Sequence, residues 1–263
     1  MNANHARRMS APLNVSNKDQ LSAADERRDC ALCGCSLAEP GTTRFAKQGA
    51  HDPTPTPYFI LENLFSELDF SEESHLLDVG CGTGRVLAFF IQSKLSGHAT
   101  GIELDPDIAE YARNWSRRFT NVDVLCGSAL ETPLAPYTHL YLFNPFDTNV
   151  LMQFIMKIEN EVRRPLTLIH MSDNGETYSY IGRTGWSLVR QGEFQEYRTA
   201  TGRAITVYVH PQHFSIWGYA PRIVAIRTSV REQAQCERAG RGRPRRSRWP
   251  RRLIGPNHDA DAT

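Results

Sequence analysis

Three glycines and an acidic residue in the first half of the chain have the spacing of a ligand site. The run "LLDVGCGTGR" places Gly80, Gly82 and Gly84 directly after an apolar stretch. Glycine allows positive φ and lets a ligand reach the backbone, and a helix that begins there points its N–H groups at the ligand. Glu103 ends the next apolar stretch, 23 residues after Gly80, where a carboxylate can accept both hydroxyls of a ribose. The spacing predicts a site for a nucleoside-containing cofactor.

Two details favour S-adenosylmethionine (SAM) over a dinucleotide in that site. The glycines follow the pattern G-x-G-x-G rather than the G-x-G-x-x-G of dinucleotide sites. Asp78, two residues before the first glycine, suits a cofactor ammonium group and would repel a pyrophosphate. An NAD site stays open as the alternative.

The stretch "LYLFNPFD", residues 140–147, ends an apolar strand on Asn144, Pro145 and Phe146. The Asn144 amide oxygen and a nearby carbonyl could accept the hydrogens of an amine and fix its lone pair. Pro145 lacks an N–H and stiffens the turn, and the face of Phe146 could pack on an acceptor and stabilise a developing cation. We predict an acceptor-positioning or catalytic role for these three residues. The alternative is a turn that only shapes the pocket.

The cysteine cluster and His170 are less indicative of a functional site. Cys30, Cys33 and Cys35 resemble one knuckle of a zinc site, but a structural zinc needs four ligands and His51 is the nearest fourth. Free cysteines are the alternative, and we assign no metal. His170 ends the predicted fifth strand, and we interpret it as a capping or core residue rather than a base.

Short β-like runs alternate with helical patterns between residues 53 and 220. The predicted strands are His75–Val79, Ala99–Glu103, Val122–Cys126, His139–Phe143 and Leu166–Met171. The predicted helices are Pro57–Leu68, Gly84–Leu95, Pro106–Phe119 and Thr148–Val162. Trp186–Tyr197 and Arg203–His210 indicate a closing hairpin joined at 199–202. The alternation predicts an α/β fold: a doubly wound, mostly parallel, seven-stranded sheet with a C-terminal antiparallel hairpin.

Composition divides the 263 residues into three parts. Residues 1–52 are predicted to be a mostly disordered leader that carries the cysteine cluster, 53–220 the folded domain, and 221–263 a basic, disordered tail. Residues 228–263 hold nine Arg and four acidic residues, although the whole chain has a net charge of only +1. Nucleic acid could bind through this tail. A solvated tail without a partner is the alternative.

No apolar run approaches the roughly 20 residues that span a membrane. Arg7 and Arg8 are not followed by the apolar stretch of a secretory signal. We therefore expect a cytoplasmic protein without a membrane partner, and we expect a monomer.

With these motifs in view, the stretch from about Thr56 to His210 resembles a class I, seven-strand SAM-dependent methyltransferase. The resemblance implies a Rossmann-like methyltransferase fold and SAM as the cofactor. The residues that match the first motif of the family, around its glycine loop, are Asp78, Gly80, Cys81, Gly82 and Gly84. Glu103 matches its ribose-binding acid.

The resemblance implies two further contacts with the cofactor. Ser128 and Ala129, after the third strand, fall where the family contacts adenine, although an acid is common where this chain has Ser128. An ordinary helix N-cap is the alternative for Ser128. The stretch "HDPTPTPYFILENLF" is similar to small bacterial methyltransferases of unassigned substrate, and to protein-lysine methyltransferases with a comparable opening segment. Thr56 and Tyr58 are therefore candidate pocket residues at the methyl-transfer end. A helix N-terminus with a packed Tyr is the alternative.

The sequence "NPFD" resembles the Asn-Pro-Pro-Tyr motif of N-methyltransferases, although the second proline is absent. We therefore predict a transferase that methylates a nitrogen acceptor, a protein lysine or another amine (EC 2.1.1.-). The acceptor itself, whether protein, small molecule or RNA, is not specified by the sequence. The alternatives are a SAM-binding or nucleoside-binding module without turnover and an NAD-dependent oxidoreductase.

Overall fold

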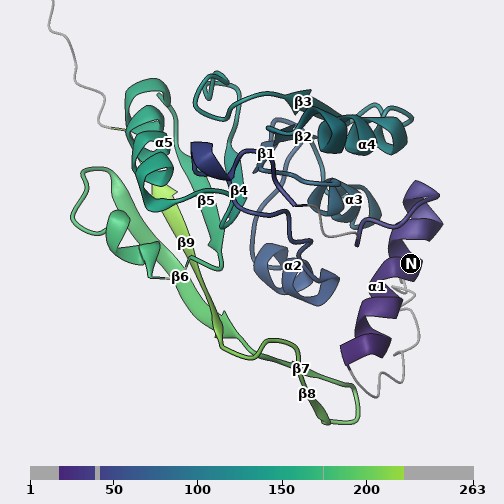
Figure 1. Cartoon of the computed structure of the whole chain (residues 1–263). Helices are drawn as coiled ribbons and strands as arrows, with labels where there is room; N and C mark the ends of the chain where they lie inside the picture. The colour runs from purple at the N-terminus through teal and green to yellow at the C-terminus, as the bar shows by residue number, and fades with distance from the viewer. Residues whose placement is uncertain (1–17, 39–41, 174, 222–263) are drawn as a thin grey trace, which may run out of the picture. The chain divides into compact units, whose positions relative to one another are not determined.

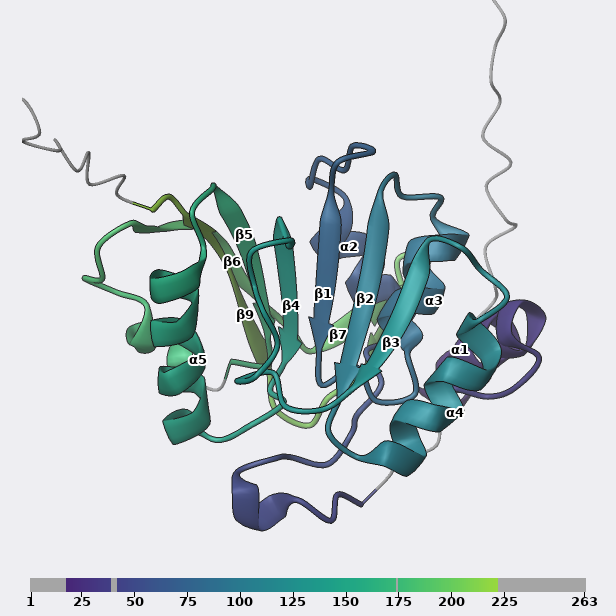
Figure 2. The same ribbon diagram turned by 90° about the horizontal axis from the view of Figure 1, so that it is seen from above.

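A seven-stranded sheet forms the centre of the computed structural model, which describes residues 18–38, 42–173 and 175–221 (Figure 1). Its strands in chain order are β1 (His75–Val79), β2 (His98–Glu103), β3 (Val122–Cys126), β4 (His139–Phe143), β5 (Leu166–Met171), β6 (Trp186–Phe194) and β9 (Gln212–Tyr219). They lie in the order β3-β2-β1-β4-β5-β9-β6, and Figure 2 shows them side by side from β6 to β3. The first five are parallel, and β9 runs antiparallel to both β5 and β6. The predicted fold class is confirmed.

Apolar clusters bury both faces of this sheet. The helices are α1 (Lys18–Cys33), α2 (Tyr58–Phe65), α3 (Arg85–Gln92), α4 (Pro106–Ser116) and α5 (Thr148–Glu161). Tyr141 packs in the cluster that contains Leu87 of α3, whereas its neighbour Leu140 packs in the cluster that contains Phe154 of α5. Successive residues of a strand point to opposite faces, so a strand covered on both sides must be apolar throughout. This burial explains the continuous apolar run at β4.

The order of the strands determines where in the sheet a ligand site is expected. From β1 the chain continues to β2 on one side, and it later returns to β4 on the other side of β1. In open α/β sheets a crevice lies outside the carboxyl ends of the strands at such a reversal, and ligands bind there. The glycine loop after β1 and the turn after β4 both face this crevice.

The closing hairpin differs from its prediction. Its two arms in the main sheet are β6 and β9, whereas the predicted second arm, Arg203–His210, lies outside the main sheet. The turn at 199–202 is present, but it joins a two-stranded ribbon of β7 (Glu196–Arg198) and β8 (Ala204–Thr206). The prediction ended the last strand before Pro211. Proline is tolerated just before a strand, and β9 begins one residue later.

The leader prediction is wrong for residues 18–33, which form α1. Few apolar residues signal this helix, and its attachment is polar. Asp29 is fully buried and accepts hydrogen bonds from Arg85 Nη2 (2.6 Å) and the Tyr58 hydroxyl (2.8 Å). Asp25 accepts from the Tyr58 backbone N–H (3.2 Å). Hydrophobic periodicity cannot reveal a helix that is held by buried carboxylates.

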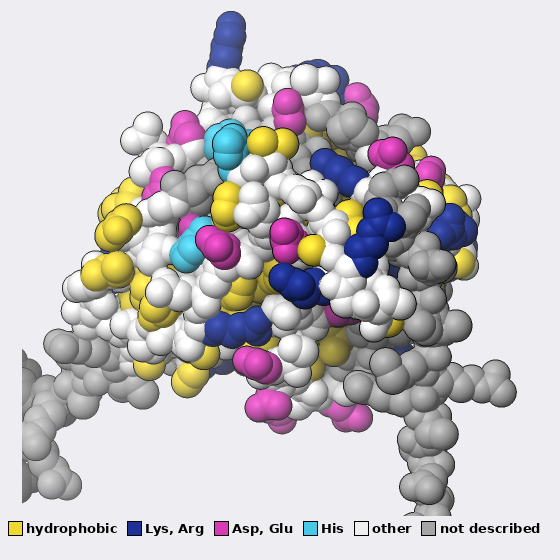
Figure 3. All heavy atoms as spheres, turned by 90° about the horizontal axis from the view of Figure 1, so that it is seen from below, with side chains coloured by type: hydrophobic (Ala, Val, Ile, Leu, Met, Phe, Trp, Pro, Cys, Tyr) yellow, Lys and Arg dark blue, Asp and Glu magenta, His cyan; other side chains and the backbone are white. Residues whose placement is uncertain are grey.

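The predicted basic tail falls, apart from Pro221, outside the described residues. Within them, no helix is long and apolar enough to cross a membrane. On the face shown in Figure 3, Lys and Arg side chains are interspersed with Asp and Glu. The described part of that face therefore offers no basic stripe for a polyanion.

Candidate functional site: a cofactor cleft beneath an N-terminal strap

The glycine loop after β1 has the backbone that the sequence predicted. Gly80, Gly82 and Gly84 have φ of 70°, 53° and 93°, in the region that side chains with a Cβ rarely adopt. A Cβ at Gly80 would also lie 2.7 Å from the Cβ of Pro145, so the loops after β1 and β4 approach too closely for any larger residue. Gly84 instead packs against Trp115, where an added Cβ would lie 2.9 Å from the ring.

Asp78 is a buried carboxylate with an unused oxygen. The residue is 3% exposed, and its Oδ2 has no hydrogen-bond partner among the described residues. Burial, and to a smaller extent the carboxylate of Glu103, raise the pKa of Asp78 well above its usual value. A buried acceptor without a partner is costly, and a cationic ligand group would relieve that cost. Asp78 therefore fits an ammonium group.

Glu103, at the end of β2, holds the glycine loop in place. Its Oε2 accepts from the Gly82 N–H (2.9 Å) and its Oε1 accepts from the Asp105 N–H (2.9 Å). Burial raises the pKa of Glu103, although the backbone N–H groups oppose that rise. Each carboxylate oxygen can accept a further hydrogen bond. The side chain is thus preorganised to receive two hydroxyl groups.

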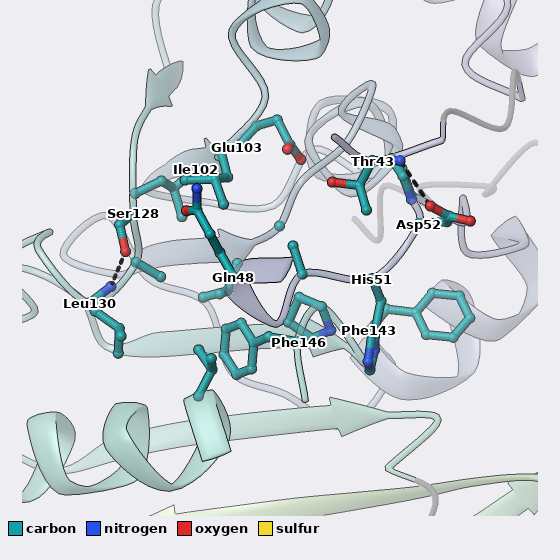
Figure 4. Close-up of a pocket in the computed structure, with 18 of the residues that line it drawn as sticks. Thr43, Gln48, His51, Asp52, Ile102, Glu103, Ser128, Leu130, Phe143 and Phe146 are labelled. Atoms are coloured by element: carbon teal, nitrogen blue, oxygen red, sulfur yellow. Dashed lines mark hydrogen bonds between the residues drawn. The ribbon is translucent and has the colours of Figure 1, made fainter. Parts of the chain in front are cut away.

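Two adjoining cavities lie over these residues. The larger measures about 220 Å³ and extends from the end of β4 across Glu103 to Ser128 and Ala129 beyond β3 (Figure 4). The smaller measures about 30 Å³ and is lined by Asp78 and the glycine loop. Four residues line both cavities and mark their junction: Pro53, Thr54, Gly80 and Phe143. Together the cavities form one cleft, which we call the cofactor cleft.

Ser128 lines the larger cavity, and its Oγ accepts from the Leu130 N–H (3.2 Å) within a turn (Figure 4). The helix N-cap alternative is wrong, because no helix begins among the described residues between β3 and β4. Cys81 lines the smaller cavity beside Gly82. Gly84 lines neither cavity.

A segment that sequence reasoning singled out only from His51 onwards covers the cleft. We call residues 43–56 the strap. At one end Arg44 forms a two-pronged ion pair with Asp105, with Nη2 2.7 Å and Nε 3.0 Å from the carboxylate oxygens. In its middle the strap pairs with the loop after β4: Ala50 forms an antiparallel bridge with Phe146, and the His51 N–H donates to the Pro145 carbonyl (3.0 Å). The sequence offered no signal for this pairing, because the partners are over 90 residues apart.

The three residues predicted to position the acceptor do not all line the cleft. Pro145 and Phe146 line the larger cavity, but Asn144 lines neither cavity. Asn144 has a left-handed backbone (φ 42°), and its carbonyl oxygen accepts a hydrogen bond from Nδ1 of His51 (2.9 Å). The contact that this residue makes to the strap comes from its backbone rather than from its amide side chain.

Of the two candidate pocket residues Thr56 and Tyr58, only the first lines the cleft. Thr56 lines the smaller cavity, and its hydroxyl lies 2.7 Å from that of Tyr141. Tyr58 is fully buried, donates to Asp29 and lines neither cavity. The assignment of Tyr58 to the methyl-transfer end is therefore corrected. The residue begins α2 with its ring turned towards α1, and the packed-Tyr alternative describes it.

The remaining polar predictions lie away from the cleft. Cys33 is buried, and burial raises the pKa of its thiol to about 12. Across residues 18–38, 42–173 and 175–221, no three His, Cys, Asp or Glu side chains are grouped as metal ligands. His170 is 2% exposed and lies 3.0 Å from the Tyr180 hydroxyl, and burial lowers the pKa of its imidazole to about 4. It is a core residue, as interpreted from the sequence.

Part of this chain is similar to known methyltransferases. Residues 76–164 match a family model described as a methyltransferase domain. An RNA methyltransferase from Salinibacter ruber, solved in complex with S-adenosyl-L-homocysteine, is 18% identical, with 65% of this chain and 96% of that chain covered at a TM-score of 0.47. A putative RNA methyltransferase from Pyrococcus horikoshii is 13% identical, with 77% and 98% covered at a TM-score of 0.48. A comparison with the curated proteins finds no match.

Likenesses at this level of identity say nothing about what this chain acts on. The matched residues run from β1 to the end of α5 and include the glycine loop, Glu103 and the turn after β4. Residues 76–164 thus match a methyltransferase domain, and they lie in the seven-stranded sheet of order β3-β2-β1-β4-β5-β9-β6.

Proposed function

We propose that this chain transfers a methyl group from SAM to a nitrogen acceptor. The observation that carries the cofactor assignment is the pair of buried carboxylates on either side of Gly80. Asp78 has an oxygen without a partner in the smaller cavity, and Glu103 is preorganised in the larger one. SAM has an ammonium group at one end and ribose hydroxyls further along, and the two cavities meet between these carboxylates.

Each part of the cofactor has a matching set of residues. Asp78 would hold the ammonium group, and the glycine loop with Cys81 would face the amino-acid portion. Glu103 would accept from the ribose hydroxyls, while Ser128 and Ala129 would contact the adenine. The methyl group would then lie near the junction of the cavities. When bound, the sulfonium supplies an activated methyl group, so the residues around it need only align the acceptor and exclude water.

The nitrogen acceptor is the narrower part of the proposal. Phe143, Pro145 and Phe146 give the junction an apolar wall, which suits the alkyl chain of an amine or a flat ring. Backbone carbonyls of the turn after β4 can accept the hydrogens of such a nitrogen. A protein lysine or another amine is the acceptor that we propose first.

Calorimetry with three ligands tests the cofactor site. S-adenosylhomocysteine carries the ammonium group, 5′-methylthioadenosine lacks it, and NADH represents the alternative cofactor. We expect Asp78→Ala to weaken S-adenosylhomocysteine at least tenfold and to leave methylthioadenosine within twofold of wild type, because only the former reaches position 78. Equal weakening of both ligands, or tight NADH binding, would overturn the site assignment.

Labelled-methyl transfer tests turnover. The full-length chain, radiolabelled SAM and a cell lysate are incubated, and the lysate is then separated into protein, RNA and small-molecule fractions. We expect label in an acid-stable, amine-linked product. Cofactor binding without transfer into any fraction would instead support a binding module, and label on oxygen would overturn the nitrogen acceptor.

A further inference from the structure

We infer that His51 of the strap is the proton acceptor for methyl transfer in the cofactor cleft. The inference rests on the proposed function and adds a catalytic residue to it. His51 lines the larger cavity, and its position on the strap places it two residues before the junction residues Pro53 and Thr54. Sequence reasoning considered this residue only as a zinc ligand.

The hydrogen bond to Asn144 fixes the tautomer of the imidazole. Nδ1 of His51 lies 2.9 Å from the carbonyl oxygen of Asn144. A carbonyl oxygen can only accept a hydrogen bond, so Nδ1 must carry the proton. In the neutral ring Nε2 is then the bare nitrogen, with a lone pair. The ring therefore has one nitrogen committed to holding it in place and the other available as a base.

The surrounding backbone holds the ring at the methyl-transfer end of the cleft. The His51 N–H donates to the Pro145 carbonyl (3.0 Å), so both the backbone and the side chain of His51 are fastened to the turn after β4. In Figure 4 the His51 ring lies on the same side of the cavity as Phe143 and Phe146. Asn144 has a left-handed backbone (φ 42°). This strained conformation has a function here, because the carbonyl oxygen of the same residue accepts the hydrogen bond that holds the His51 ring.

An amine that arrives as an ammonium ion must lose a proton before it can attack, and that proton passes to Nε2 of His51. The freed lone pair then forms a bond to the methyl carbon, the carbon–sulfur bond breaks, and its electron pair stays on sulfur. The positive charge of the sulfonium ends on the methylated nitrogen, and the charge of the original ammonium ion ends on the imidazolium, so atoms and charge balance.

Charged side chains also lie on the strap, against it and in the larger cavity. Asp52 is adjacent in sequence and accepts from the Thr43 N–H (2.8 Å). Asp147 packs against the strap at Gly49, where an added Cβ would lie 2.8 Å from its Oδ2. Glu103 lines the same cavity. Arg44 and Lys47 are the cations of the strap, and the guanidinium of Arg44 is paired with Asp105 and Asp107.

Two substitutions of His51 distinguish its role as a base from its hydrogen bond to the Asn144 carbonyl. In His51→Asn the side-chain N–H₂ can still donate to the Asn144 carbonyl, but no base remains. In His51→Ala the hydrogen bond and the base are both lost, and the removed ring leaves space for added imidazole. We expect S-adenosylhomocysteine affinity within about threefold of wild type for His51→Asn, and methyl transfer into the fraction labelled by wild type to fall about 100-fold or more. Added imidazole should raise transfer by His51→Ala in proportion to its concentration.

A direct readout of the tautomer complements the kinetics. In the full-length chain labelled with ¹⁵N-histidine, the resonances lost in His51→Asn identify the ring, and we expect protonated Nδ1 and bare Nε2. His98→Asn, which replaces a half-buried histidine paired with Asp123 outside the cofactor cleft, serves as the matched control and should transfer at the wild-type rate.

Three results would overturn the inference. The first is transfer by His51→Asn at the wild-type rate, and the second is a ring that carries its proton on Nε2. Either would leave the proposed function standing, because cofactor binding and wild-type transfer are measured independently. The third is the absence of any transfer by wild type, which would remove the proposed function and this role together.

Discussion

At the scale of single residues, Glu103 holds the glycine loop and is the residue that we propose for the ribose of the cofactor. Its two oxygens hold the N–H groups of Gly82 and Asp105, so the carboxylate is oriented before a ligand arrives. Preorganisation of this kind strengthens binding, because the side chain loses no further rotational freedom. The residue therefore fixes the conformation of the loop, and under the proposed function it would also accept from the ribose.

Replacement of Glu103 should cost cofactor affinity. We expect Glu103→Ala to weaken S-adenosylhomocysteine by about 10- to 100-fold in calorimetry, because hydrogen bonds to a charged group contribute roughly 1.5–3 kcal/mol each. Glu110→Ala, which removes an exposed carboxylate paired with Arg113 on α4, is the control and should bind normally. Unchanged affinity in Glu103→Ala would contradict the assignment of Glu103 to the ribose.

At the scale of elements, α1 depends on a buried ion pair. Arg85 begins α3 directly behind the glycine loop, and its guanidinium is 2.6 Å from Asp29. Leu37 and Tyr58 also donate to Asp29, so one carboxylate receives hydrogen bonds from three elements or loops. A charge buried in this way must stay paired, since removal of one partner leaves the other uncompensated.

Asp29→Ala should therefore destabilise the domain by about 3–5 kcal/mol, because Arg85 would keep a buried charge with a weaker partner. The measurement is the urea unfolding midpoint, with amide exchange over residues 18–33 as the local readout. Asp19→Ala on the exposed side of the same helix should change stability by less than about 0.5 kcal/mol. Equal midpoints for the two variants would show that α1 does not depend on this pair.

At the scale of the whole molecule, buried histidines set the response to acid. Burial lowers the pKa of His139 and of His170 to about 4, so neither imidazole takes up a proton in the folded state above that pH. The unfolded chain does take up these protons below its ordinary pKa of about 6.5. Burial also raises the pKa of Asp25 to about 6, which acts in the opposite direction.

Each buried histidine is expected to lose stabilisation on acidification. Between pH 7 and pH 5, His139 and His170 each withdraw about 2 kcal/mol from the free energy of unfolding, and Asp25 returns about 1 kcal/mol. The lowered pKa of His75 acts with the two histidines, and the raised pKa values of Asp78 and Glu103 act with Asp25. Urea titrations of wild type and a variant at the two pH values isolate the contribution of one histidine. His139→Gln should lose about 2 kcal/mol less than wild type over this range. An identical loss in that variant would exclude His139 as a contributor.

The local sequence determined the sheet and the cofactor loop. Five strands, the glycine pattern and the acid at the end of β2 are all recorded in residues that are near one another in the chain, and local spacing and hydrophobic periodicity reveal such features. The position of Ser128 beyond β3 followed from the same alternation of strands and helices.

Only the tertiary structure decided what closes the cleft. The strap crosses the site because residues 49–51 pair with residues 145–147, and α1 docks because buried carboxylates meet Arg85. Asn144 could be recognised as unusual from its sequence, but not as the residue whose carbonyl fixes His51, 93 positions away. Contacts between distant segments leave no period in the sequence, so this part of the site becomes visible only when the chain is folded.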